Sequence, residues 1–235
     1  MGDATRRGSI SGGSPSRVSW AKAWHSLTFL IIAISMVTQL VLVIRGHGVL
    51  VAPSGRTAGL PERLLRFFSY FTIQSNLVAA GTALGLIARP NRDGGAWRVL
   101  RISAIVGMTV TFVTYIVVLR PIVHLLGIAK LTDIGFHYVA PVLTVLGWYL
   151  YGPWPRIDIT SLLRHLVWPL SYLAYVLVLG AITGWYPYPF INVGKIGYPR
   201  ALLNALAVTV LLLIVGAVYR ALDTRRGGAK AKPLA

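Results

Sequence analysis

Cysteine is absent from this 235-residue chain, and acidic residues are scarce, with six aspartates and glutamates against 23 lysines and arginines. The lack of cysteine excludes disulfides, thiolate catalysis and cysteine-ligated metal sites. Charged residues make up 12% of the chain, whereas a soluble domain carries about 25%. So few charges cannot cover a globular domain with a polar surface, and we therefore expect a membrane protein.

Hydrophobic residues make up 55% of the chain, and its mean hydropathy is +0.67. They gather into long blocks, each close to the roughly 20 residues that a helix needs to span a bilayer. We therefore predict an all-α integral membrane protein, a bundle of six transmembrane helices. The predicted spans are approximately residues 20–44, 67–88, 99–119, 134–151, 162–182 and 201–219.

The polar ends divide the chain into a disordered basic N-terminal tail (1–18), a transmembrane domain (19–220) and a disordered basic C-terminal tail (221–235). Of the 23 basic residues, 15 lie on the side of the bundle that holds both tails and 8 on the other side. Because cytoplasmic loops carry the excess of lysine and arginine, we predict a multi-pass protein of the cell membrane with both termini cytoplasmic.

The formal charge of +17 would indicate nucleic-acid binding in a soluble protein. Here the basic residues are spread over tails and loops, with no basic helix face. We therefore expect the partners to be membrane lipids, with the basic residues contacting anionic headgroups at the cytoplasmic face, and we expect no nucleic-acid partner. The frequent use of Ala, Gly and Arg is typical of a GC-rich bacterium, and no feature of the sequence indicates an oligomeric state.

One apolar stretch, residues 66–80, carries several polar side chains within a few positions. At about 100° per residue, Ser69, Thr72, Ser75 and Asn76 share one helical face. Lipid cannot satisfy their hydrogen bonds, so this face should meet other helices. It is either a set of interhelical hydrogen bonds or the wall of a site.

A second polar group falls in the fourth predicted span, where Asp133, His137 and Pro141 recur at helical spacing. Pro141 lacks an N–H, so we expect a kink that leaves the carbonyl of His137 free. Asp133, four residues before His137, is placed to bond one imidazole nitrogen and fix the tautomer. The alternative is an interfacial histidine that bonds headgroups or water.

The predicted topology puts Thr72 and His137 at a similar depth, near the non-cytoplasmic side. A threonine hydroxyl becomes a nucleophile when a base removes its proton and donors stabilise the oxyanion. We therefore predict catalytic Thr72 and His137, with Asp133 orienting the base and Asn76 and Ser75 as supporting donors. Such a site suits a lipid ester. The other histidines lack ligand partners at metal spacing, so we predict no metal and no cofactor.

Three motifs together resemble one family. They are Tyr70-Phe71-Thr72-Ile73-Gln74-Ser75-Asn76, Phe136-His137 with Pro141, and Trp185-Tyr186-Pro187-Tyr188-Pro189-Phe190. They are similar to motifs of the androgen-induced protein family of multi-pass membrane proteins, especially its bacterial six-span relatives. The animal members hydrolyse fatty acid esters of hydroxy fatty acids with a threonine and a histidine. The resemblance covers roughly residues 20–220 and implies these roles for Thr72 and His137.

Two other functions stay open at this stage. A non-enzymatic membrane regulator or scaffold would use the same polar stripe for packing alone. Charged residues deep in the spans or an inverted repeat would favour a small transporter, and neither stands out in the sequence. The segment 185–190 is likewise either a turn within the aromatic belt or a lid over a non-cytoplasmic site.

Overall fold

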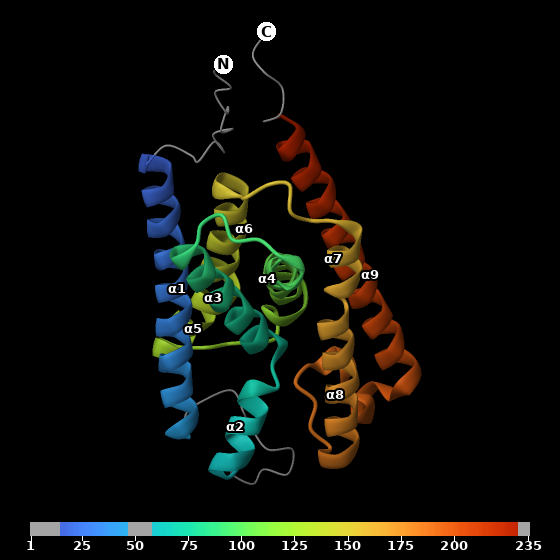
Figure 1. Ribbon diagram of the computed structural model, residues 1–235. Helices are drawn as coiled ribbons and strands as arrows, with labels where there is room; N and C mark the ends of the chain where they lie inside the picture. Colours follow the sequence, from blue (N-terminus) through green and yellow to red (C-terminus); the bar gives the residue numbers. More distant parts are fainter. Residues whose placement is uncertain (1–14, 47–57, 230–235) are drawn as a thin grey trace, which may run out of the picture.

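The computed structural model describes residues 15–46 and 58–229 (Figure 1). Within these ranges all regular structure is helical and no strand occurs. Six helical rods are long and apolar enough to cross a membrane. The prediction of an all-α protein with six candidate membrane spans is therefore confirmed.

The six rods are built from shorter elements, some joined end to end. The elements are α1 (Pro15–Ile44), α2 (Leu60–Phe68), α3 (Phe71–Ala88), α4 (Gly95–Thr114), η1 (Tyr115–Leu119), α5 (Gly127–Ile134), η2 (Gly135–Val139), α6 (Ala140–Tyr151), α7 (Ile159–Arg164), α8 (Val167–Thr183), η3 (Pro189–Ile191) and α9 (Val193–Ala229). Both η1 and η2 are single π-helical turns. The turn η1 continues α4, and η2 joins α5 to α6. The rod α5–η2–α6 begins at Gly127, about two turns before the predicted span.

Helix α4 runs through the middle of the bundle and packs against α3, α6, α7 and α9 (Figure 1). Every residue from Arg101 to Met108 is buried, as expected for a helix surrounded by other helices. Gly107 lets the ring of Trp168 pack closely against α4, because a Cβ at position 107 would lie 3.1 Å from that ring. The middle of α4 is consequently enclosed by other elements, whereas Gly95 and Ala96 at its start are exposed.

The start of α1 and the end of α9 lie at the same end of the bundle, which we call the termini face (Figure 1). The opposite end, the distal face, carries α2 and the connection from α8 to α9. An even number of spans places both chain ends on one side. The cytoplasmic position of the termini face stays a prediction from the distribution of basic residues.

Helix extends beyond the predicted limits of the transmembrane domain at both ends. Helix α1 begins at Pro15 and α9 ends at Ala229, so residues 15–18 and 221–229 are helical. Tertiary contacts explain the extension: Arg17 donates to the carbonyl of Leu150 at 3.0 Å, and Asp223 accepts from two backbone N–H groups. The remainder of the predicted tails, 1–14 and 230–235, lies outside the described residues.

The stretch 66–80 is not one continuous helix as its polar face predicts. The chain breaks between α2 and α3 at Ser69 and Tyr70. Two tyrosines of α8 hydrogen-bond to Ser69 at this break. Tyr172 donates to the Ser69 carbonyl at 2.9 Å, and the hydroxyls of Tyr175 and Ser69 bond each other at 2.7 Å. Thr72 is therefore the second residue of α3, at a helix N-terminus.

Candidate active site

A chain of hydrogen bonds links Thr72, His137 and Asp133. Thr72 Oγ1 lies 3.2 Å from His137 Nε2, and His137 Nδ1 lies 2.9 Å from Asp133 Oδ1. The side chains of His137 and Asp133 are only 13% and 12% exposed. The order hydroxyl, imidazole, carboxylate is that of an activated nucleophile, its base and the group that orients the base.

The position of the Asp133 backbone fixes the tautomer of His137. Its carbonyl oxygen lies 3.1 Å from His137 Nδ1, beside the carboxylate oxygen. Both neighbours are acceptors, so Nδ1 carries the hydrogen and Nε2 of the neutral ring keeps its lone pair. That lone pair faces the hydroxyl of Thr72, which therefore donates to it.

His137 lies in the π-helical turn η2, four residues before Pro141. In this wider register the N–H of Ala140 bonds the carbonyl of Gly135. In the same register the next donor would be residue 141, but Pro141 has no N–H to give to the carbonyl of Phe136. Asn76 Nδ2 donates to this oxygen at 3.4 Å. A π-helical turn often marks a functional site.

Tyr115 completes the surroundings of the carboxylate, and it was not anticipated from sequence. Its hydroxyl donates to Asp133 Oδ2, and its ring stacks on His137 with centroids 4.0 Å apart. In the sequence Tyr115 is one more aromatic near a span end, as the aromatic belt explains. Only the pairing of η1 with η2 brings it to the site.

The segment 184–192 packs into the site and does not lie at the surface as a simple turn. Tyr188 is 8% exposed, and its hydroxyl oxygen accepts from the backbone N–H of Thr72 at 3.3 Å. Its ring meets the edge of Tyr70, while Asn204 Nδ2 donates to the carbonyl of Phe190 at 2.8 Å and anchors the segment on α9. Burial raises the pKa of Tyr188, so its hydroxyl keeps its proton.

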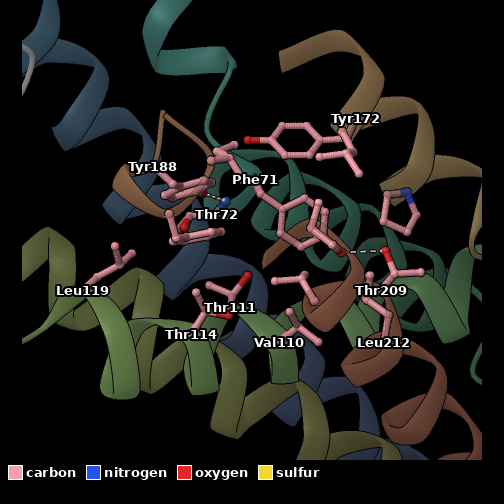
Figure 2. Close-up of a pocket in the computed structure, with 16 residues that line it drawn as sticks. Phe71, Thr72, Val110, Thr111, Thr114, Leu119, Tyr172, Tyr188, Thr209 and Leu212 are labelled. Atoms are coloured by element: carbon pink, nitrogen blue, oxygen red, sulfur yellow. Dashed lines mark hydrogen bonds between the residues drawn. The ribbon is translucent and has the colours of Figure 1, made fainter. Parts of the chain in front are cut away.

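Thr72 lies where two cavities meet. The larger has a volume of about 260 Å³ and the smaller about 70 Å³, and Thr72, Leu119 and Tyr188 line both. Figure 2 shows the smaller cavity, with Thr72 beside Tyr188 and with Thr111 and Thr114 of α4 below them. The larger cavity also reaches Asp133 and His137. The remaining walls are mostly apolar.

The two predicted supporting donors lie elsewhere. Asn76 is fully buried, and its amide donates to the carbonyls of Thr72 and Phe136, which ties α3 to η2. The hydroxyl of Ser75 lies against Gly107 of α4. Neither residue lines the cavities at Thr72. The structure thus brings together Thr72, His137 and Asp133, with Asn76 behind them and Ser75 apart.

Within residues 15–46 and 58–229, no group of three or more histidine and carboxylate side chains is placed to hold a metal ion. Compared with known proteins, the chain matches no family model, no curated protein and no solved structure. The resemblance to the androgen-induced protein family consequently stays a prediction that rests on the three motifs.

Proposed function

We propose that this multi-pass membrane protein is a threonine-dependent hydrolase of lipid esters. One observation carries the proposal: the partly buried hydrogen-bond chain from Thr72 through His137 to Asp133, which lines a mostly apolar cavity. A structural hydrogen bond alone would not need a histidine whose second nitrogen is held by a carboxylate. The proposal includes that the protein is bacterial and lies in the cell membrane.

In the first half of the reaction, Thr72 Oγ1 attacks the ester carbonyl carbon while its proton passes to His137 Nε2. The carbon–oxygen bond to the alcohol then breaks, and the alcohol oxygen takes that proton from His137. In the second half, a water molecule gives a proton to His137 and attacks the acyl-threonine. The acid leaves, and the proton returns to Thr72. Asp133 stabilises the imidazolium in both halves.

Tyr188 supplies the donor for the oxyanion in this proposal. Its oxygen accepts the N–H of Thr72, and its side chain lines both cavities, so in this proposal the O–H turns to the oxyanion when the ester is bound. The N-terminus of α3 adds a positive partial charge at the same place, because Thr72 is the second residue of that helix. Asn76 acts as a positioning residue that holds α3 against η2.

A lipid suits the cavity better than a water-soluble ester. Apolar side chains such as Val43, Phe67 and Phe136 form most of the wall of the larger cavity, and the polar groups gather around Thr72. Binding sites for lipophilic ligands have this distribution, with a few polar groups to fix orientation. With the predicted topology, the site lies toward the non-cytoplasmic leaflet.

Covalent labelling by a fluorophosphonate probe tests the proposal on the detergent-purified protein. We expect labelling of the wild type, with loss in Thr72→Ala and in His137→Ala. Thr209→Ala is the matched control, because Thr209 lines the smaller cavity but bonds only the carbonyl of Ala205. If the folded wild type is neither labelled nor able to hydrolyse lipid esters, the proposal is wrong and a scaffold or regulator takes its place.

A further inference from the structure

A second polar centre lies near the termini face, in the second turn of α4. Arg101 is only 6% exposed, and its Nε and Nη2 atoms are buried without a hydrogen-bond partner. Fourteen residues separate it from Tyr115, so about 20 Å of helix lies between this centre and the catalytic chain. The centre is therefore distinct from the proposed hydrolase site.

The carboxylates near this end of the bundle are occupied by other groups. Asp93 pairs with Arg98 and with Arg156 Nε, the latter at 3.2 Å. Asp158 pairs with Arg98 at 3.0 Å and accepts from a backbone N–H at the start of α7. Of the carboxylates in residues 15–46 and 58–229, none forms an ion pair with Arg101.

Asp223 is the remaining acidic residue in this region, and it is fully buried. Its Oδ2 accepts the backbone N–H groups of Arg156 and Ile157 at 2.5 and 2.8 Å, which holds the end of α9 on the segment before α7. No hydrogen bond or ion pair joins it to Arg101. The positive charge of Arg101 is thus left without a compensating partner among the described side chains.

A small cavity of about 10 Å³ lies beside Arg101. Arg98 and Arg156 also line it, together with Trp97 and Trp148. Such a volume holds about one water-sized body. Arg98 and Arg156 are paired with carboxylates and Arg101 is not, so the space lies beside one uncompensated positive charge. It is too small for a phosphate or a lipid headgroup but large enough for a monatomic ion.

We propose that this cavity binds a small monovalent inorganic anion, with chloride as the natural candidate. A buried guanidinium without a partner is costly, and an anion beside it restores the balance of charge. Water fills the same volume but does not neutralise the charge. The N-terminus of α4 favours the anion further, because its partial charge is positive.

The test measures thermal unfolding of the full-length, detergent-solubilised protein at constant ionic strength in chloride, bromide or gluconate. Binding stabilises the folded state by mass action. At saturating chloride or bromide, we expect the unfolding midpoint to exceed that in gluconate by about 4–10 °C. Equal midpoints in chloride and gluconate overturn the proposal.

Two variants locate the effect. Arg101→Met is expected to abolish the difference between chloride and gluconate, while Arg164→Met, which removes an exposed arginine, keeps it. A halide effect that survives in Arg101→Met contradicts the assignment. If Arg101→Met does not fold, crystals of the wild type grown in bromide decide the matter, because an anomalous peak beside Arg101 supports the site and an empty cavity refutes it. None of these measurements depends on hydrolase activity.

Discussion

Replacing Asp133 by asparagine tests how the proposed base is held and charged. The substitution keeps the size of the side chain and removes its negative charge. The backbone carbonyl of Asp133 still accepts from His137 Nδ1 at 3.1 Å, so the imidazole keeps the tautomer that faces Thr72. What Asp133→Asn removes is the stabilisation of the imidazolium that forms when His137 takes the proton of Thr72.

The magnitude follows from the distances at the site. The carboxylate oxygen lies 2.9 Å from Nδ1. Charge centres about 4 Å apart interact by about 4 kcal/mol at an effective dielectric constant of about 20. A hydrogen bond to a charged group exceeds a neutral one by about 1–2 kcal/mol, which sets a lower bound. Since about 1.4 kcal/mol is tenfold in rate, we expect a loss between about 10-fold and 10³-fold.

The assay is the second-order rate constant for fluorophosphonate labelling of Thr72, measured from pH 6 to 9 with the thermal midpoint as a control for folding. A serine-protease triad loses about 10⁴-fold when its aspartate becomes asparagine, because the wrong tautomer forms. Here the backbone carbonyl of Asp133 is a second acceptor that holds the tautomer, so we expect a smaller loss of labelling rate. A change under about twofold would remove Asp133 from the mechanism, and a loss as complete as that of Thr72→Ala would refute the role of the backbone carbonyl.

Two other predictions concern the oxyanion donor and the loops at the termini face. Tyr188→Phe removes one proposed donor and should lower the labelling rate by about 10²-fold with folding retained, whereas an unchanged rate excludes that role. Hydrogen bonds from Arg98 hold the pKa of Asp93 well below its usual range, and the Ser161 N–H lowers the pKa of Asp158. Their stabilisation is complete above the unfolded pKa of about 3.9 and is lost as pH falls through the lower folded values, so unfolding midpoints in detergent should decline below about pH 4. Asp93→Asn with Asp158→Asn should flatten this decline, and an equally steep decline in the double variant would contradict the assignment.

Composition and local periodicity by themselves determined the class of the protein. A chain with 12% charged residues and bilayer-length apolar blocks has few alternatives to a bundle of membrane helices. The pair Asp133 and His137 was also within reach of sequence, because residues four apart meet on any helix. That Thr72 meets His137 was inferred from a shared predicted depth and a family motif.

The tertiary structure decided the rest, because these contacts join residues that are distant in sequence. Tyr175 of α8 forms a hydrogen bond with Ser69, which stabilises the break before α3 and so places Thr72 at the start of that helix. Tyr115 reaches Asp133 because η1 lies beside the junction of α5 and η2, and Tyr188 reaches Thr72 because its segment folds back over the cavities. Periodicity describes one helix at a time, so it reports which face is buried and leaves open what that face meets.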